Sequence, residues 1–349
     1  MSRHRLRWPG ESGCPLSTGD LSGVLATIGD TPLVALERVV PIADVQVFAK
    51  MEKFNPGGSV KDRTALHMLR GKIQAGELVP GRSVVVESTS GNLGVGLAQL
   101  CAYFGLELIC VVDTRTTTQS VALLRAYGAA VEVVSAPGGD LLGARIARVR
   151  ELVAELPDAF WPNQYENPLN AAAHEQTMAE IVTALDGRVD YLFCSVGTGG
   201  TLRGCADHIR DHGLATKLVA VDAAGSAIFH TPTEDRLIPG HGAGWRPPLV
   251  GSVEAAGAIS EIVHVTDLEC VRACRLLVAR EAILAGGSSG ATVAALGKLR
   301  HRIPAGSRCV LVFPDDGNRY LDTIYSDSWV LEHFGEVPEV TTRPLTAAR

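Results

Sequence analysis

Short apolar runs alternate with longer amphipathic segments along the chain. The runs are rich in β-branched residues and almost continuously apolar, which is typical of parallel strands buried on both faces. They cover residues 45–52, 83–88, 107–113, 130–135, 191–196, 217–222 and 308–314. Between them, apolar residues recur at helical spacing in residues 60–73, 120–128, 141–156, 172–185 and 269–284. This alternation predicts an α/β protein with doubly wound parallel sheets.

Composition limits the classes of protein to which the chain can belong. Its 349 residues exceed the roughly 100 to 200 residues of a typical domain, so we expect two lobes or one large α/β unit. Hydrophobic residues make up 46%, aromatic residues only 5%, and 37 residues are glycine, which suits an α/β enzyme better than a disordered or fibrous chain. The net charge of -6 and the lack of a basic stripe argue against nucleic-acid binding.

The eight cysteines favour a reducing compartment. They lie in apolar or helical-looking segments without the paired spacing of a zinc site, so we expect buried, reduced thiols and no metal. The N-terminal residues lack the apolar core of a signal peptide, and no run of about 18 apolar residues is present to span a membrane. We therefore expect a cytoplasmic protein with loose tails at residues 1–20 and 336–349.

Four segments rich in glycine and hydroxyl residues follow predicted strands, where parallel sheets place their ligands. In the first, residues 53–63 (KFNPGGSVKDR), Lys61 stands after a turn of small residues at the start of a predicted helix. A lone lysine in this position is most often a solvated surface charge. Here its small neighbours leave room for a planar ligand, and an amine in buried surroundings has a depressed pKa and becomes a nucleophile and base.

The other three segments offer hydroxyls and free backbone N–H groups. Residues 88–92 (STSGN) first suggest a helix N-cap, and they also suit a carboxylate ligand. Residues 197–201 (GTGGT) open a helix after a strand and suit a phosphate monoester. Residues 286–290 (GGSSG) are either a flexible turn or a means of placing Ser288 against a ring.

A dinucleotide site is the rival interpretation of the third segment. Gly197, Gly199 and Gly204, with Asp222 at the end of the next predicted strand, resemble a nicotinamide-binding fingerprint. Leu202 departs from the G-x-G-x-x-G pattern, and threonines at 198 and 201 suit an isolated phosphate better than a pyrophosphate. The sequence therefore favours a phosphate monoester over a dinucleotide.

The segments N-x-G-G-S-x-K-D-R, S-T-S-G-N, G-T-G-G-T and G-G-S-S-G, in this order, resemble the fold type II pyridoxal-phosphate enzymes of the cysteine synthase family. The resemblance extends over residues 24–330. It implies a tryptophan synthase β-like fold of two doubly wound parallel-sheet domains, pyridoxal 5′-phosphate as cofactor, and a homodimer. It also implies a large cofactor-binding domain (21–54 and 166–335) and a small mobile substrate domain (55–165).

The resemblance further implies a role for each matching residue. Lys61 carries the cofactor as a Schiff base and acts as a general base once the substrate displaces it. Asn92 lies beside the ring hydroxyl, and Ser288 faces the pyridine nitrogen, where a neutral hydroxyl favours β-elimination over transamination. The residues expected around the cofactor phosphate are Gly197, Thr198, Gly199, Gly200 and Thr201. Those expected at the substrate α-carboxylate are Ser88, Thr89, Ser90 and Gln164.

Other segments resemble a narrower group, the N-(2-amino-2-carboxyethyl)-L-glutamate synthases. Residues 221–229 (VDAAGSAIF) lack the Val-Glu-Pro of sulfhydrylases, and Tyr165 stands where those enzymes carry phenylalanine. Residues 239–248 (PGHGAGWRPP), residues 318–329 (NRYLDTIYSDSW) and Arg145 carry the same resemblance. By its helical position alone, Arg145 is a rim residue. Together with Tyr165 it is a candidate for binding an anionic donor, and Arg246 is a candidate for the glutamate carboxylates.

The expected reaction is a β-replacement. O-phospho-L-serine and L-glutamate, through an α-aminoacrylate, would give N-(2-amino-2-carboxyethyl)-L-glutamate and phosphate, a step toward 2,3-diaminopropionate for siderophores and peptide antibiotics. One alternative is a cysteine synthase acting on O-acetylserine or O-phosphoserine with sulfide. Another, of a different class, is a catalytically silent regulatory or binding relative, against which the intact Lys61 and Ser288 argue. We expect small-molecule substrates, and neither nucleic acid nor membrane as a partner.

Overall fold

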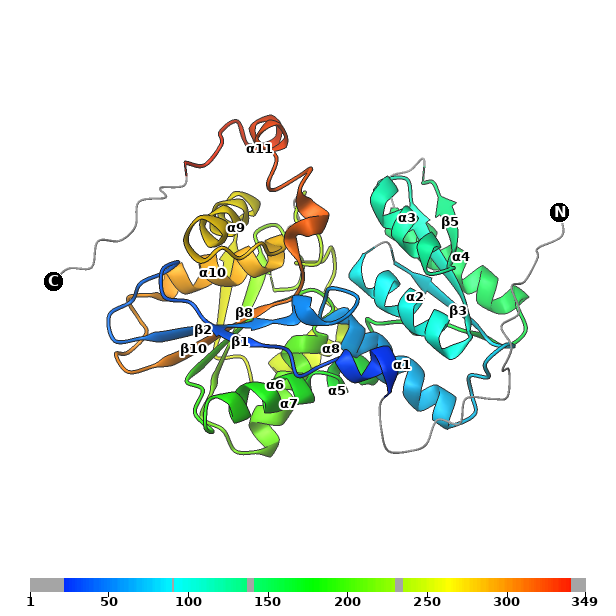
Figure 1. The fold of residues 1–349 in the computed structure, drawn as a ribbon, viewed down its shortest axis with the longest axis horizontal. Coiled ribbons are helices and arrows are strands. Elements are labelled where there is room, and N and C mark those ends of the chain that lie inside the picture. The colour runs from blue at the N-terminus through cyan, green and yellow to red at the C-terminus, as the bar shows by residue number, and fades with distance from the viewer. Residues whose placement is uncertain (1–21, 90, 137–140, 230–234, 340–349) are drawn as a thin grey trace.

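A computed structural model describes residues 22–89, 91–136, 141–229 and 235–339. The predicted tail at 1–20 lies outside the described residues, and so do residues 340–349 of the predicted C-terminal tail. The described residues form two sheets, and Figure 1 shows them in two lobes with α1 (Lys61–Gln74) and α5 (Pro168–Ala172) between them. Within this part of the chain, no helix has the length and apolar character needed to cross a membrane.

The larger sheet has six strands in the order β1-β2-β10-β7-β8-β9. All neighbours run parallel except β1, which is antiparallel to β2 at the sheet edge. Its strands are β1 (Leu33–Ala35), β2 (Gln46–Met51), β7 (Tyr191–Ser195), β8 (Lys217–Ala223), β9 (Glu261–Val265) and β10 (Arg308–Phe313). The four strands predicted in this region are confirmed. The prediction missed β1, which has only three residues, and β9, whose exposed positions at the other edge dilute its apolar pattern.

The smaller sheet has four parallel strands in the order β5-β4-β3-β6. They are β3 (Val84–Ser88), β4 (Glu107–Asp113), β5 (Ala130–Val134) and β6 (Ala159–Phe160), and the first three are the predicted strands. Two largely parallel sheets confirm the predicted α/β class. The division of the chain at residues 54/55 and 165/166, and the mobility of the smaller part, stay predictions.

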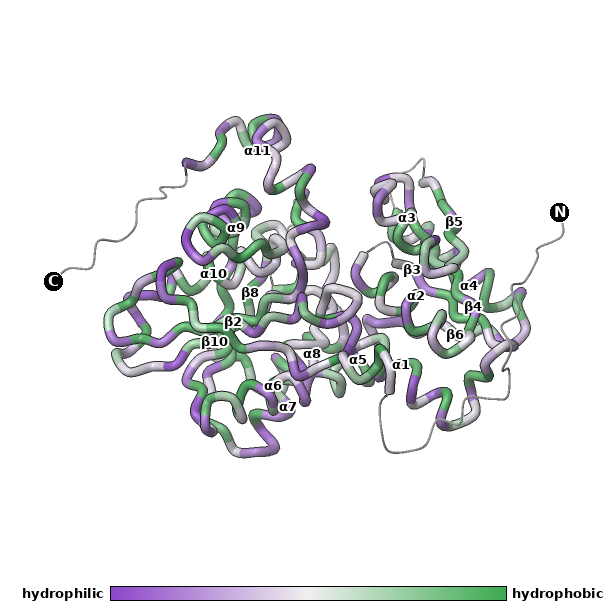
Figure 2. Tube along the Cα trace, in the orientation of Figure 1, coloured by the Kyte–Doolittle hydropathy of each residue, from purple (hydrophilic) through white to green (hydrophobic). Residues whose placement is uncertain are grey.

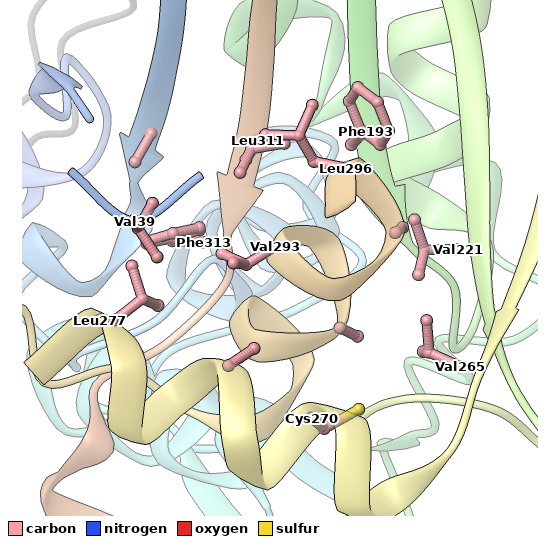
Figure 3. Close-up of a cluster of buried hydrophobic side chains, with 14 of the residues drawn as sticks. Val39, Phe193, Val221, Val265, Cys270, Leu277, Val293, Leu296, Leu311 and Phe313 are labelled. Carbon is pink, nitrogen blue, oxygen red and sulfur yellow. The ribbon is translucent and has the colours of Figure 1, made fainter. Parts of the chain in front are cut away.

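Helices cover both faces of each sheet with apolar side chains. α9 and α10 pack on one face of the larger sheet, where Figure 3 shows Leu296 of α10 beside Leu311 of β10 and Leu277 of α9 beside Val39. α6, α7 and α8 cover its other face. On the smaller sheet, α1 and α2 pack on one side and α4 on the other. Helix bounds are α2 (Asn92–Phe104), α3 (Thr118–Ala126), α4 (Leu141–Glu155), α6 (Glu175–Ala184), α7 (Gly200–Asp211), α8 (Pro248–Ala255), α9 (Asp267–Glu281), α10 (Gly287–Leu299) and α11 (Asp327–Phe334).

The local sequence explains where these elements begin and how they pack. α9, for example, starts at a capping box in which Thr266 and Glu269 satisfy each other's backbone N–H groups. Figure 2 shows the hydrophobic residues concentrated on strands such as β4 and β10 and on the helices that face them. The seven described cysteines are free and buried, as predicted, and Cys14 lies outside the described residues.

Candidate active site

The turn before α1 is shaped by two glycines. The Gly57 N–H donates to Asp62 Oδ2 at 2.5 Å. A side chain at position 57 would place its Cβ 2.4 Å from Asp62 Oδ1, and Gly58 has a φ of +83°, which side chains rarely adopt. Glycine is therefore required at both positions for a turn that delivers Lys61 to the first position of α1.

The Lys61 side chain lies in surroundings that favour its neutral form. Burial lowers the pKa of the Lys61 amine from 10.5 to about 8. A far larger fraction of this amine is therefore unprotonated at neutral pH than for an exposed lysine. An unprotonated amine can condense with an aldehyde and can remove a proton from carbon, which are the two roles predicted for Lys61.

A buried ionic cluster fixes α1 against the larger sheet. Arg63, in the first turn of α1, donates from Nε to Glu52 Oε2 and from Nη2 to Glu180 Oε2, both at 2.7 Å. Lys50 of β2 donates to the same Glu180 oxygen at 2.5 Å. The side chains of Arg63, Glu52 and Lys50 are almost completely inaccessible to solvent. Loss of one member would leave buried charges unpaired, so the cluster holds the Lys61 turn in place.

A second network joins the Lys61 turn to the start of α2 and to the segment after β10. Asn92 Nδ2 donates to Asp315 Oδ2 at 2.8 Å, and Tyr320 donates its hydroxyl to the same oxygen at 2.5 Å. Arg319 donates from Nη1 to Asn92 Oδ1 and from Nη2 to Gly57 O, the latter at 2.6 Å. The sequence analysis identified Asn92 but missed Asp315 and Arg319, although they too follow the end of a parallel strand.

Residues 197–201 form a tight loop between β7 and α7. Gly199 has a φ of +86°, and a Cβ there would lie 2.6 Å from Val250 Cγ2. A Cβ at Gly200 would lie 2.2 Å from Asn170 Oδ1, and one at Gly197 would lie 3.0 Å from Gly240 O. The three glycines thus let the loop pack closely while its N–H groups open the N-terminus of α7, an arrangement that suits an anion.

Two buried side chains that the sequence analysis missed support the threonines of this loop. Asn170 Nδ2 donates to Thr198 Oγ1 at 3.0 Å, and its Oδ1 accepts from Thr64 at 3.1 Å. His174 Nε2 lies 3.4 Å from Thr201 Oγ1. Burial, followed by the positive charge of Lys61, lowers the pKa of His174 well below its usual value, so the imidazole is neutral. Thr64 and His174 link the loop to α1, and therefore to Lys61.

Ser288 lies in the buried first turn of α10. The N-cap of this helix, Gly286, donates its N–H to Asp315 O at 3.2 Å. A Cβ on Gly286 would lie 1.9 Å from Asp315 Oδ1, so this helix start and the Asn92 network are in direct contact. The structure thereby brings the segments of Lys61, Asn92 and Ser288 together.

Among the residues predicted at the substrate α-carboxylate, Ser88 and Thr89 lie at the end of β3 and Gln164 lies in the segment after β6. Ser88 Oγ is buried without a hydrogen-bond partner among the described residues, whereas Thr89 Oγ1 accepts from Gly94 N, in the first turn of α2, at 3.2 Å. Ser90 lies outside the described residues. The backbone carbonyl of Gln164 accepts from Asn170 Nδ2 at 2.7 Å. Because Asn170 also donates to Thr198, this bond joins Gln164 to the 197–201 loop.

Glu87 anchors the segment that carries Gln164 and Tyr165. Its Oε1 accepts from the Trp161 indole N–H at 3.0 Å and from Ser88 N at 2.9 Å. Burial raises the pKa of Glu87 to about 7. The sequence analysis missed this contact between β3 and the segment that follows β6.

The structure places two of the three candidates for anion binding near each other and the third apart. Arg145, on α4, is mostly buried, and its Nε lies 3.3 Å from Asp113 Oδ2 at the end of β4. The Tyr165 ring packs against Trp245 with centroids 5.3 Å apart. Burial raises the pKa of the Tyr165 hydroxyl, and the charge of Arg145 acts in the opposite direction. Arg246 is exposed and pairs with Glu254 on α8, and no described contact joins it to the other two.

The assembled groups fit pyridoxal phosphate better than a dinucleotide. The Lys61 amine, with its lowered pKa, matches the aldehyde of the cofactor. The glycine-lined 197–201 loop matches a phosphate monoester, and the buried Ser288 hydroxyl matches a pyridine nitrogen. Asp222, the acid that a dinucleotide ribose would need, is fully buried and accepts from Ala223 N at 2.9 Å. It is therefore not presented to a ribose.

Comparison with known proteins identifies the family. Residues 24–315 match the family described as pyridoxal-phosphate dependent enzyme. The chain is 42% identical over 335 residues to the N-(2-amino-2-carboxyethyl)-L-glutamate synthase of Cupriavidus metallidurans, covering 94% of this chain and 97% of that protein. Its fold resembles O-acetyl serine sulfhydrylase isoform 3 of Entamoeba histolytica (TM-score 0.82, 32% identity, 95% of this chain and 96% of that one). It also resembles O-ureido-L-serine synthase (TM-score 0.80, 30% identity, 92% and 98%). The chain therefore belongs to the family of pyridoxal-phosphate dependent enzymes, with the fold type II architecture of the cysteine synthases.

Proposed function

We propose that this enzyme joins O-phospho-L-serine and L-glutamate into N-(2-amino-2-carboxyethyl)-L-glutamate and releases phosphate. The observation that carries the proposal is the 42% identity, over 94% of the chain, to a synthase of that name. Arg145 and Tyr165, the two side chains predicted to distinguish this group from the sulfhydrylases, are close enough for the charge of one to act on the pKa of the other. The product would supply 2,3-diaminopropionate biosynthesis.

Bound pyridoxal phosphate would withdraw electrons from the donor Cα, while the side chains of the chain bind the substrates and move the protons. Lys61 would remove the Cα proton, the C–O bond to phosphate would break, and the glutamate amine would form the new C–N bond at Cβ. Lys61 would then return a proton to Cα, and the attacking amine would lose one to solvent. The 197–201 loop would hold the cofactor phosphate, Asn92 its ring hydroxyl and Ser288 its pyridine nitrogen. Ser88, Thr89, Ser90 and Gln164 would orient the donor carboxylate.

Three properties of the whole molecule belong to the same proposal. Residues 55–165 would move as a small substrate domain, and the enzyme would be a homodimer in the cytoplasm. The moving domain and the dimer follow from the resemblance to fold type II enzymes, in which closure of a domain excludes water from the reacting groups. The cytoplasmic location follows from the cysteines, which are expected to be reduced.

The test is a comparison of substrates with the purified holoenzyme. The enzyme receives O-phosphoserine or O-acetylserine as donor and glutamate or sulfide as acceptor, and product masses and initial rates are recorded. We expect the glutamate adduct from O-phosphoserine to form fastest. Cysteine formed from O-acetylserine and sulfide much faster than this adduct would instead identify a sulfhydrylase, the function suggested by the Entamoeba structure.

A further inference from the structure

The segment between β8 and α8 passes beside the 197–201 loop. Gly242 N–H donates to Val196 O at 2.7 Å, directly before that loop. Gly240 O lies 3.0 Å from the position of a Cβ on Gly197. Trp245, at the end of the same segment, packs on the Tyr165 ring. Residues 236–245 therefore connect the loop that suits the cofactor phosphate with the tyrosine predicted to contact substrate.

Arg236 lies at the start of this segment and is half-buried. Its Nη1 makes one long hydrogen bond, 3.5 Å to His241 O, and its buried Nε has no hydrogen-bond partner among the described residues. No ion pair joins it to a described carboxylate. Asp267 accepts from Leu237 N at 2.6 Å, and the charge of Arg236 acts on this carboxyl group without forming an ion pair with it. Desolvation of a charged group without an anion is unfavourable, so this guanidinium has donors to offer to a ligand.

The surroundings of Arg236 contain further unused polar groups. His241 is buried, and neither of its ring nitrogens has a hydrogen-bond partner within the part of the chain that the structure describes. Burial, together with the charge of Arg236, lowers the pKa of His241 to about 3, so the ring is a neutral donor and acceptor. The charge of Arg236 also opposes the effect of burial on the Tyr165 pKa, as does that of Arg145. The two arginines thus act on the same tyrosine from different elements.

We propose that Arg236 binds a carboxylate of the acceptor amino acid, with the neutral His241 beside it as a hydrogen-bonding partner. This inference rests on the proposed function, in which a dicarboxylate must be held while its amine attacks Cβ. Arg145 is tied to Asp113 at the end of β4 in the smaller sheet, whereas Arg236 lies in the segment between β8 and α8 that passes beside the cofactor-phosphate loop. A free guanidinium with parallel N–H groups is the side chain best matched to a carboxylate. Arg236 is accordingly assigned to the acceptor, in place of the exposed Arg246.

The first measurement is binding of glutarate to the holoenzyme by calorimetry. Glutarate has both carboxylates of glutamate but no amine, so it binds without reacting. We expect Arg236→Gln to raise its Kd by about 10- to 100-fold, as for the loss of a charge-assisted hydrogen bond, and Arg236→Lys to raise it less. Arg302→Gln, which removes an exposed arginine paired with Glu261, is the control and should not change the Kd. The absorbance of the bound cofactor reports whether each variant is folded and loaded.

The second measurement separates acceptor from donor. We expect Arg236→Gln to raise the KM for glutamate by a similar factor and to change the rate of phosphate release from O-phosphoserine without acceptor by a much smaller factor. If the wild type does not bind glutarate, or if it binds glutarate equally well after substitution, the assignment of Arg236 is wrong. Phosphate release slowed by as large a factor as the KM for glutamate is raised would assign Arg236 to the donor and also overturn its assignment to the acceptor. Failure of the wild type to form the glutamate adduct, with glutarate binding still dependent on Arg236, would refute the proposed reaction and leave the carboxylate site standing.

Discussion

Lys61 should destabilise the cofactor-free protein, because the fold holds an ammonium group in surroundings that favour the neutral amine. Lys61→Met keeps the length of the side chain and removes the charge. The pKa of Lys61 falls from 10.5 to about 8 on folding. Since one pKa unit corresponds to about 1.4 kcal/mol, the charged form disfavours folding by up to about 3 kcal/mol at pH 7. We therefore expect the variant to be more stable than the wild type by up to that amount.

The effect has a defined pH dependence. Between about pH 8 and 10.5 the unfolded wild type retains a proton that the folded protein has lost, so the stability of the wild type rises with pH in this window. The advantage of Lys61→Met should therefore shrink from about 3 kcal/mol at pH 7 to about 1 kcal/mol at pH 9.5. His174, whose pKa the charge of Lys61 lowers, is neutral in the folded protein throughout this pH window, so its titration does not enter the difference between the two proteins.

The assay is urea unfolding of the cofactor-free proteins at both pH values. Lys72→Met is the matched control, because Lys72 lies on the same helix but is partly exposed and pairs with Glu77 at 2.6 Å. It should change the free energy of unfolding by less than about 1 kcal/mol. A Lys61→Met variant that is less stable than the wild type, or whose advantage is independent of pH, would refute the reasoning. The same variant should form no borohydride-stable adduct with pyridoxal phosphate, and an adduct at another lysine would contradict the role of Lys61.

Further expected outcomes concern the cofactor and the donor. Thr198→Val and Thr201→Val should each raise the Kd for the cofactor by about 10- to 100-fold in equilibrium dialysis, because each removes a hydroxyl from a charged phosphate. An unchanged Kd in both variants would indicate that the threonines have a structural role only. Ser288→Asp should slow phosphate release from O-phosphoserine by holding the pyridine nitrogen protonated, and an equal or faster rate would exclude Ser288 as its partner. Arg145→Ala should lower kcat/KM for O-phosphoserine by about 10- to 100-fold more than for O-acetylserine, since only the former presents a dianion. Arg148→Ala, on the same helix but paired with Glu132, is its control, and equal losses on both donors would contradict the assignment.

The sequence by itself determined the class of fold and the segments from which the candidate site is built. Continuous β-branched runs such as residues 107–113 are readable as buried parallel strands, because burial on both faces removes any polar alternation. Short or edge strands are not readable in this way, since β6 has two residues and β9 exposes part of one face. The glycine and hydroxyl segments are also local signals, because tight turns and helix starts require particular residues within a few positions.

Only the tertiary structure decided which distant side chains support those segments. Asn170 lies on the short helix α5 and His174 is the N-cap of α6, and nothing in their spacing shows that they contact Thr198 and Thr201. Asp315 reaches Asn92 across 223 residues of chain.

Charge pairing is decided in the same way. Arg236, Arg145 and Arg246 carry the same charge, yet the fold leaves the first without an ion pair among the described residues, places the second beside Asp113 and pairs the third with Glu254. A sequence specifies which side chains can carry charge. Which of these charges stay available to a ligand depends on the partners that folding brings within a few ångströms, and on the water that it removes.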